Sequence, residues 1–529
     1  MKISRRTFAA FGIALMSATA LPGMADAKSL KIGLAAAVTS LDPHYYNATP
    51  NHTVAMHVFD TLTMRDPAGR VEPWLATSWE VKGDNEWEFK LRDDVRWHDG
   101  EPFTAADVAF TLERVKDVPG SIGGFSGLIN TIASTEAVDA HTLRITTSTP
   151  TPNMPVFLSQ IEIVSRHVGK GASTEDYNAG RVMVGTGPYK FARYLPGERV
   201  ELARNDDWWG ERQEWDNLSL VIVTNVATRM AALMSGDLDI VEVPNAPDIG
   251  RLRQNSAFSI HSAPSLRVSY VLPFFQAGEG ADPVRRKDGT AFEQSPLLNR
   301  DVRRALSMAI NRQGIAERVM LGTGIPTGQF MPEGAYSYDP SILVPTADPE
   351  GAKKLLAEAG FADGFALNMV VANDRVPYNV EVAQALAQMW ARIGIDMTVD
   401  SVPTSVAIPR ATAQRIPIYI DNFGNSTAEV GRLLTAMLQT VDPERSRGEY
   451  NWIRYSSPDY DAAVDAAVVD LDPETREAKL QAAARMALED YAMIPMYHFV
   501  NAWAAKADIS YEARGDAMTL ATFIRSAPQ

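Results

Sequence analysis

The stretch Val184–Gly210, VGTGPYKFARYLPGERVELARNDDWWG, is the most informative part of this chain for its fold. The residues GTGP at 185–188 predict a rigid turn, because glycine tolerates a positive φ and proline fixes its own. Two short strands are predicted next, Tyr189–Tyr194 and Arg199–Ala203, followed by the aromatic pair Trp208–Trp209. The stretch holds no catalytic nucleophile, metal-ligand cluster or phosphate loop. It therefore predicts a scaffold element and not a reaction centre.

The N-terminal residues 1–27 predict an export signal. Ser4–Phe8 contains a twin-arginine pair, and Phe8–Leu21 is an apolar run too short to span a bilayer. Ala25–Ala27 then supplies a small-x-small cleavage site, so we expect a mature chain that begins at Lys28 in the periplasm. A retained N-terminal anchor helix is the alternative.

Composition narrows the possible functions. The chain has no cysteine among 529 residues, which excludes disulfides, thiolate metal sites and a thioether lipid anchor. The formal net charge of −15, without a basic run, makes a nucleic acid an unsuitable partner. At 46% hydrophobic and 22% charged the chain is ordinary globular material, and its length predicts at least two lobes.

Strands and turns dominate the first half of the chain. Within the block Trp87–Val108, alternating apolar residues predict a half-buried strand at 87–91. Thr104 is then expected to cap a helix, Ala105–Val115. The glycine-containing segment Gln276–Ser295 is a predicted loop that either links the two halves or forms a long surface insertion.

Helices become frequent after residue 295. The periodicity predicts helices after Asn299, after Asp348 and over residues 380–393, and a strand Ile395–Val399 follows the last of these. Helix, glycine and strand in succession are typical of an α/β lobe. A long helix from Asp472 to about Tyr491 comes next. The chain is expected to close with two strands, Met493–Phe499 and Ala502–Lys506.

Taken together, these segments resemble the periplasmic solute-binding proteins of peptide, nickel and opine importers (family 5). The landmarks are Leu41–Pro43, Val58–Leu62, Trp87–Val108, Gly185–Gly210, Asn299–Asn311, Asp348–Gly360, Gln384–Ile395 and Ile494–Tyr497. The resemblance implies an α/β fold, a two-lobed class II-like clamshell with an extra N-terminal subdomain at about 71–185. Lobe I would comprise residues 28–280 and 500–529, and lobe II residues 281–499. It also implies that ligand is captured between the lobes and delivered to a membrane ABC permease and ATPase.

Arg375 is the strongest candidate for a ligand-binding residue. It matches the loop from which similar dipeptide-binding proteins present an arginine to the ligand carboxylate, and a guanidinium pairs bidentately with such a group. A surface arginine paired with Asp374 or Glu381 is the alternative.

The second candidate region is Ile418–Glu429, IYIDNFGNSTAE. In the resembling proteins a tryptophan here is followed three residues later by an aspartate that pairs with a peptide ammonium. Phe423 matches the tryptophan and Ser426 takes the place of the aspartate. The ammonium anchor is therefore missing unless Asp421 substitutes. The remaining candidates, a polar cradle for hydroxyls or an anion, are Asn422, Gly424, Asn425 and Thr427; an ordinary turn before a helix at 430–438 is the alternative.

The third candidate region, Asp42–Asn47 on the other lobe, supplies His44, Tyr45 and Tyr46. The two tyrosine rings would stack on a ligand or pack on the surface of the lobe.

The sequence thus predicts a monomeric solute-binding protein for a small polar, acid-bearing ligand: an opine-like compound, a sugar-phosphate conjugate, or a modified or short peptide. It carries no G-x-S-x-G, H-E-x-x-H or P-loop motif, and its eight scattered histidines do not have metal-ligand spacing, so no cofactor, metal or catalytic residue is expected. A conventional di- or oligopeptide carrier, an exported hydrolase and a sensor that presents ligand to a receptor remain alternatives.

Overall fold

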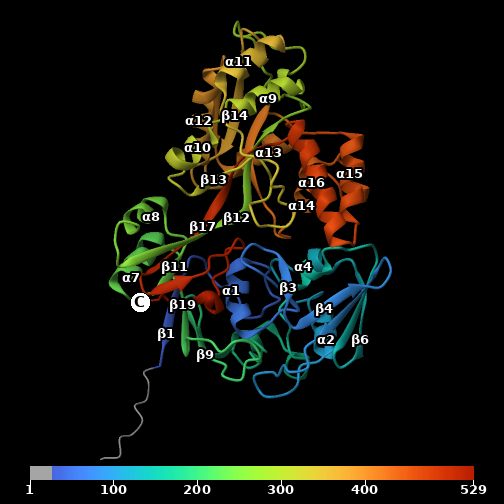
Figure 1. Ribbon diagram of the computed structural model, residues 1–529, viewed down its shortest axis with the longest axis vertical. Helices are drawn as coiled ribbons and strands as arrows, with labels where there is room; N and C mark the ends of the chain where they lie inside the picture. Colours follow the sequence, from blue (N-terminus) through green and yellow to red (C-terminus); the bar gives the residue numbers. More distant parts are fainter. Residues whose placement is uncertain (1–26, 529) are drawn as a thin grey trace, which may run out of the picture.

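The computed structural model describes residues 27–528, so the predicted leader, apart from Ala27, lies outside the described residues. Two lobes lie one above the other and are joined by two long strands, β12 (Phe258–Pro273) and β17 (Ile494–Lys506) (Figure 1). These strands pair antiparallel in both lobes, and the register shifts between Pro264 and Val268. They belong to one eleven-stranded sheet with the order β15-β14-β16-β12-β17-β11-β1-β10-β9-β8, to which β13 adds by pairing with β17.

Lobe I contains the β1 end of this sheet. Its core, from Leu30 to Ile524, packs against α1 and buries Trp503 and Trp215. The strands are β1 (Ser29–Leu34), β8 (Tyr189–Leu195), β9 (Arg199–Arg204), β10 (Asn217–Ile222) and β11 (Ile240–Glu242). The helices are α1 (Thr49–Val58), α5 (Arg166–Gly169), α6 (Thr174–Asn178), α7 (Val226–Ser235) and α8 (Ala246–Leu252). Two small antiparallel pairs complete it: β2 (Thr63–Arg65) with β3 (Val71–Pro73), and β18 (Ile509–Tyr511) with β19 (Ile524–Ser526).

A four-stranded sheet of order β4-β5-β7-β6 forms the extra subdomain beside lobe I. Its core runs from Leu62 to Ile163. The strands are β4 (Ala76–Val81), β5 (Glu86–Leu91), β6 (Ile132–Asp139) and β7 (Thr142–Thr147), with helices α2 (Ala105–Arg114), α3 (Ser126–Ile129) and α4 (Met154–Leu158). Trp87, Phe89 and Leu91 of β5 are buried, as their alternation predicts.

Lobe II is a sheet with helices on both faces. One face packs on α9, α11 and α12 and the other on α13, α15 and α16, so successive residues of β12 alternate between two cores. The strands are β13 (Gly324–Pro326), β14 (Phe365–Ala372), β15 (Ile395–Val402) and β16 (Ile418–Gly424). The helices are α9 (Arg300–Met308), α10 (Arg312–Gly314), α11 (Pro349–Glu358), α12 (Asn379–Ala391), α13 (Thr404–Thr412), α14 (Gly431–Leu433), α15 (Pro458–Val468) and α16 (Pro473–Glu489). None of the helices in residues 27–528 is long and apolar enough to cross a membrane.

The stretch Val184–Gly210 contains the predicted hairpin, in which β8 and β9 pair antiparallel. Its turn lies against α1: an added Cβ at Gly185 would stand 1.7 Å from Val58 O, so glycine is required there. The aromatic pair faces a buried carboxylate, because Asp60 Oδ2 accepts a 3.0 Å bond from Trp209 Nε1. Asp60 also accepts bonds from Trp74 and Thr186, of 2.8 and 2.9 Å. This stretch thus fastens lobe I to the subdomain.

The structure corrects two expectations about the junction between lobes. Residues Leu266–Phe274 already pack in a lobe II core, so the chain crosses at about residue 264 of β12 and not near residue 280. The segment Gln276–Ser295 is an excursion on lobe II, where Arg285 forms a bridge with Ala366 of β14. The two expected closing strands are one strand, β17, because its pairing with β12 continues through residues 500 and 501.

Candidate ligand-binding site

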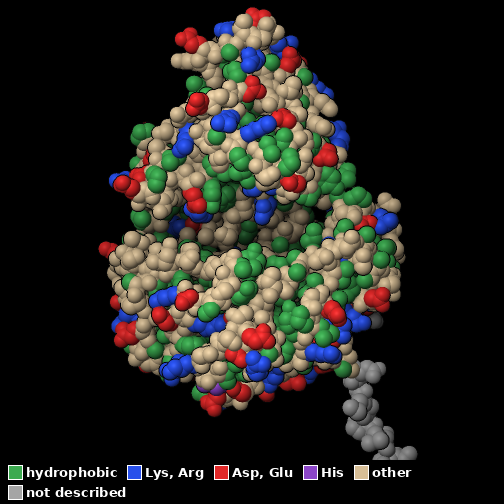
Figure 2. Space-filling view, turned by 180° about the vertical axis from the view of Figure 1, so that it is seen from behind, with side chains coloured by type: hydrophobic (Ala, Val, Ile, Leu, Met, Phe, Trp, Pro, Cys, Tyr) green, Lys and Arg blue, Asp and Glu red, His purple; other side chains and the backbone are tan. Residues whose placement is uncertain are grey.

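The candidate polar residues gather where β16 ends, at the face of lobe II that looks toward lobe I. β16 pairs antiparallel with β12, which places Asp421 beside Tyr270 and Asn422 beside Ser269. The chain then leaves the sheet as the loop Gly424–Glu429 and enters α14, which continues as a π-helical turn to Leu438. Figure 2 shows the hollow between the lobes from behind, with basic atoms at its walls.

Arg375 and Asp421, two of the predicted residues, are brought together. Arg375 lies in the loop between β14 and α12, and its Nε is 3.0 Å from Asp421 Oδ1, an ion pair that lacks the alignment of a hydrogen bond. The Arg375 side chain keeps 32% of its surface exposed, whereas that of Asp421 is buried. Burial raises the pKa of Asp421, and Arg375 only partly opposes that shift. The sequence alternatives for Arg375, pairing with Asp374 or Glu381, are not seen among its described contacts.

The loop Gly424–Glu429 is polar and only partly satisfied. Asn425 is buried and bonds Leu266 O through its backbone N–H and its Nδ2. Four side-chain atoms of this region are buried without a hydrogen-bond partner: Asp421 Oδ1, Asn422 Nδ2, Asn425 Oδ1 and Thr427 Oγ1. Because an unpaired buried polar atom costs about 1–3 kcal/mol, a rearrangement that pairs these atoms would be favourable. Phe423 is half-buried against the lobe II core.

A polar cavity of about 390 Å³ lies between the lobes at this loop. Lobe II lines it with Arg267, Gly424, Asn425 and Ser426 among others. Lobe I lines it with residues that the sequence reasoning missed, chiefly Asn47–Thr49, His52, Arg65, Gln160 and Asp516. Arg65 and Arg267 carried a usable signal, since each is a charge inside an apolar strand pattern, LTMR and LRVSYVL.

Guanidinium groups outnumber carboxylates around this cavity. Arg267 Nη1 donates a 2.7 Å hydrogen bond to Asn422 Oδ1. Burial lowers the pKa of Arg267, and the nearby charge of Arg375 lowers it further. On lobe I, Arg65 Nη1 donates a 3.0 Å bond to Ser426 O across the gap. Burial lowers the pKa of Arg65; Asp516 opposes this shift and Arg514 adds to it.

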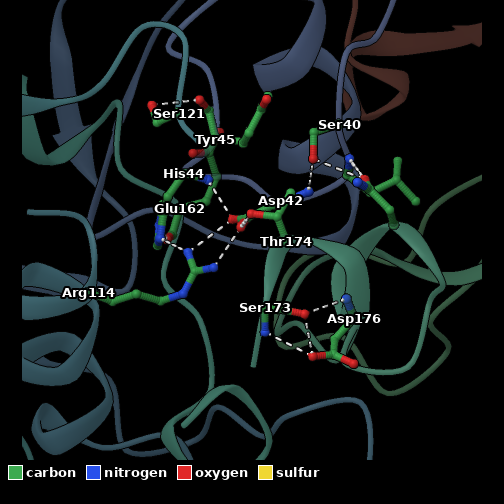
Figure 3. Close-up of polar contacts among 12 residues, drawn as sticks. Ser40, Asp42, His44, Tyr45, Arg114, Ser121, Glu162, Ser173, Thr174 and Asp176 are labelled. Atoms are coloured by element: carbon green, nitrogen blue, oxygen red, sulfur yellow. Dashed lines mark hydrogen bonds and ion pairs between the residues drawn. The ribbon is translucent and has the colours of Figure 1, made fainter. Parts of the chain in front are cut away.

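His44, Tyr45 and Tyr46 do not line this cavity. Figure 3 shows the side chain of His44 beside that of Arg114. His44 is buried, its Nδ1 accepts a 2.7 Å bond from Arg114, and its Nε2 donates to Glu162 O at 2.8 Å. The ring is thereby fixed in its neutral form, and burial lowers its pKa to about 4. Sequence analysis placed His44 among the ligand-binding candidates, and its buried, fully bonded ring corrects that assignment.

The tyrosines pack on a neighbouring loop. Tyr45 O accepts a 2.8 Å bond from Ser121, and the Tyr46 ring lies so close to Gly123 that an added Cβ there would stand 2.5 Å from it. Both side chains are half-buried and neither lines the interlobe cavity. The packing alternative is therefore the one that the structure supports.

A second interlobe cavity, of about 580 Å³, lies on the other side of the same loop. The walls are mostly apolar, with Trp79 and Val81 from the subdomain and Tyr336 and Leu471 from lobe II. Its floor holds the buried pair Glu429–Arg476, with two bonds of 2.7 and 2.8 Å. Asn153 of lobe I donates a 3.0 Å bond to Glu429. The loop Gly424–Glu429 therefore contacts lobe I on both sides, through Arg65 and through Asn153.

Metal binding has no support in residues 27–528, where no group of three or more His, Cys, Asp or Glu side chains could hold an ion. Buried histidines such as His52, which bonds Glu162 Oε1 at 2.7 Å, serve internal hydrogen bonds instead.

Comparison with known proteins identifies the family. The profile described as "Bacterial extracellular solute-binding proteins, family 5 Middle" matches residues 70–443. Heme-binding protein A of Haemophilus influenzae is 27% identical over 460 residues, with 82% of this chain and 79% of that protein covered. Di/tripeptide-binding protein 1 of Pseudomonas aeruginosa is 27% identical over 488 residues, covering 86% of each.

A solved structure supports the fold. The unliganded open form of MppA, a periplasmic murein tripeptide-binding protein, superposes with a TM-score of 0.82 over 95% of this chain and 98% of that one, at 21% identity. Two lobes, a shared long sheet and an extra subdomain are what the described residues show, and the family profile spans most of them. The chain belongs to the bacterial extracellular solute-binding proteins of family 5.

Proposed function

We propose that this chain is the extracytoplasmic solute-binding component of an ABC importer and that it captures a small polar ligand with an acidic group. Family membership supports the carrier role, since its relatives are binding proteins. That the ligand carries an acidic group is inferred from the site and not from the relatives. An opine-like compound, a sugar-phosphate conjugate, and a modified or short peptide all carry such a group.

The observation that carries the acidic group is the arrangement around Asp421. Burial raises the pKa of this single carboxylate, and two guanidinium groups, those of Arg375 and Arg267, partly oppose the shift. Asp421 pairs with Arg375, and Arg267 is left with a neutral partner, Asn422. A carboxylate or phosphate is the group that a guanidinium binds bidentately. We therefore assign ligand binding to Arg375, Arg267 and the loop Gly424–Thr427.

Delivery to a transporter requires that ligand favour one arrangement of the lobes. A ligand shifts that equilibrium only by its difference in affinity for the two arrangements. The polar cavity suits this role because both lobes line it, and its occupant would contact Arg65 and Arg267 at once.

Native mass spectrometry of protein purified without denaturation tests the ligand class. We expect a retained small molecule that carries a carboxylate or phosphate. A neutral or purely cationic ligand would contradict the proposal.

Titration calorimetry with the identified acid then tests the site. Arg375→Gln removes the charge and leaves a neutral amide that can still donate a hydrogen bond, so we expect affinity to fall at least tenfold, about 1.4 kcal/mol. Arg212→Gln is the matched control, because Arg212 is an exposed lobe I arginine paired with Asp206. Unchanged affinity in Arg375→Gln would remove Arg375 from the site.

A conventional di- or oligopeptide carrier is the second candidate. The names of the relatives and the presence of Asp421 beside Arg375 favour it, since a peptide ammonium could pair with Asp421 while its carboxylate pairs with Arg375. A melting screen with matched dipeptides and their N-acetyl derivatives separates the two, because a tight ligand raises the melting temperature by mass action. Preference for the free amine supports the peptide carrier, and tolerance of acetylation supports our proposal.

Export, partners and lack of catalysis are further parts of the proposal. We expect a monomer in the periplasm, cleaved after Ala27, that docks on a membrane permease and its ATPase and turns over no substrate. N-terminal sequencing of the periplasmic protein should begin at Lys28, with export lost when Arg5 and Arg6 become lysines. Sustained product formation from peptides or glycans by purified protein would favour the hydrolase alternative.

A further inference from the structure

We infer that the ligand carries two acidic groups, carboxylate or phosphate, one bound by Arg65 of lobe I and the other by Arg267 of lobe II. This inference rests on the proposed function and narrows its ligand class. It gives each lobe its own anchor for one molecule.

On lobe I the charge of Arg65 is left over. Asp516 is the nearest carboxylate, but Arg514 already binds it with two bonds, Nε to Oδ1 at 3.1 Å and Nη2 to Oδ2 at 2.7 Å. Asp66 raises the pKa of Arg514 and is not among the charges that shift the pKa of Arg65. The one described hydrogen bond of the Arg65 guanidinium is to a neutral carbonyl, Ser426 O. Arg65 shares the carboxylate of Asp516 with Arg514, so a ligand anion would offset more of the cost of burying the charge of Arg65.

On lobe II, too, an arginine has a neutral hydrogen-bond partner while the nearby carboxylate pairs with another arginine. Asp421 is paired with Arg375, and Arg267 bonds only the neutral side chain of Asn422. The Arg267 guanidinium lies along Gly424, at 3.5 Å from the position of an added Cβ, so no side chain shields it from the cavity there.

Both arginines line one cavity of about 390 Å³, so a single small molecule can reach both. Asp516, held by Arg514, is the one acidic residue among the described residues that line it. The other polar lining groups are the imidazole of His52 and amides and hydroxyls such as Asn47, Gln160 and Ser426. Two positive anchors among neutral hydrogen-bonding groups fit a diacid better than a monoacid.

The lowered pKa values of Arg65 and Arg267 agree with this arrangement. For each, burial is the main cause. Asp516 opposes the shift of Arg65 and Arg514 adds to it; for Arg267, Arg375 adds to the shift and Asp421 opposes it. A bound anion beside either group would act in the opposite direction.

The test uses two pairs of probes, each a diacid and its monoacid partner, and only the first pair keeps the size constant. N-acetyl-L-glutamate has two carboxylates, and N-acetyl-L-glutamine replaces one of them by an amide. N-acetyl-O-phospho-L-serine and N-acetyl-L-serine repeat the comparison for phosphate. We expect the glutamate or the phosphoserine derivative to bind at least tenfold more tightly than its partner in calorimetry, and the stronger pair tells carboxylate from phosphate.

Variants locate the two charges. Arg65→Gln and Arg267→Gln should each abolish the preference for the diacid, whereas the control Arg212→Gln keeps the preference. Because Arg65 is buried, Arg65→Lys provides a second variant that keeps the charge, and it should keep the preference.

Equal binding within both probe pairs overturns the inference, and so does a preference that survives in Arg65→Gln or Arg267→Gln. If monoacids bind with the dependence on Arg375 described above, the proposed function stands while the second charge is ruled out. If no acid of either kind binds, both proposals fail.

Discussion

At the scale of single residues, the most consequential feature is a set of buried neutral histidines. His44, His57, His98 and His498 each have a pKa lowered from the ordinary 6.5 to about 4, mainly by burial. His57 shows how the neutral form is held: Nδ1 donates to Thr53 O at 2.6 Å, and Nε2 accepts from Ala521 N–H at 3.0 Å.

We predict that the free energy of unfolding falls as pH drops from 6.5 toward 4. In this window the unfolded histidines bind protons and the folded ones do not, so stability rises with pH and is lost on acidification. Each histidine contributes up to about 3 kcal/mol. Urea denaturation at a series of pH values measures this, and His57→Gln should flatten the slope by about one proton.

The control for that slope is Gln254→Ala, which replaces an exposed amide on lobe I and changes no titratable group. It should leave the pH dependence unchanged. A wild-type stability that is flat between pH 6.5 and 4 would contradict the prediction.

Asp60 is a second residue whose role can be tested. Asp60→Asn keeps its size but presents an amide N–H₂ toward indole N–H groups, leaving donors of Trp74 or Trp209 unpaired. We expect a loss of about 1–3 kcal/mol and a lower melting temperature. Asp207→Asn, whose side chain is 92% exposed in the same stretch, should change neither. Equal melting temperatures for the two variants would contradict the anchoring role of Asp60.

At the scale of elements, the turn at residues 185–188 depends on a close approach of two backbones. Gly185→Ala would place a methyl group 1.7 Å from Val58 O, so we expect it to abolish folding or to cost several kcal/mol. Gly250→Ala is the control, since Gly250 lies in α8 with no atom within 4 Å of the added Cβ. It should be neutral or stabilise by up to about 1 kcal/mol. Soluble yield and melting temperature of the two variants measure the difference.

The elements that follow local rules could be predicted from the sequence. The β8–β9 hairpin, the capping box of α2 at Thr104 and Asp107, and the start of α9 after Asn299 all lie as expected. Each depends on residues close in sequence, so periodicity and capping suffice to find it.

Features set by distant partners could not be read from the sequence. β17 continues past Val500 because β12 pairs with it, and the lobe crossing moved to residue 264 for the same reason. Arg65 and Ser426 are 361 residues apart and meet only in the folded protein. His44 is likewise held by Arg114 of α2, which lies 70 residues further along the chain. The Arg375 loop and the loop after β16 were found because the family resemblance marks them.

At the scale of the whole molecule, Asn153 connects the lobes without contacting the polar cavity. In Asn153→Ala, Glu429 keeps both bonds to Arg476, so stability should change by less than about 1 kcal/mol. We expect the ligand-free protein to open, with a larger radius of gyration in small-angle X-ray scattering. Gln254→Ala, an exposed amide on lobe I, is the control. An unchanged radius of gyration would show that this contact does not hold the lobes together.

The two strands that cross between the lobes also determine when each lobe can be completed during synthesis. Lobe II is an insertion: the chain enters it along β12 and leaves it along β17. Synthesis of lobe I begins first, but its strand β11 has no β17 to pair with until β17 has been made. Trp215 Nε1 also donates a hydrogen bond to Ile524 O, which lies close to the last described residue. The lobe whose translation starts second can therefore fold first, and lobe I stays open at one sheet edge until residues as far as Ile524 have been made.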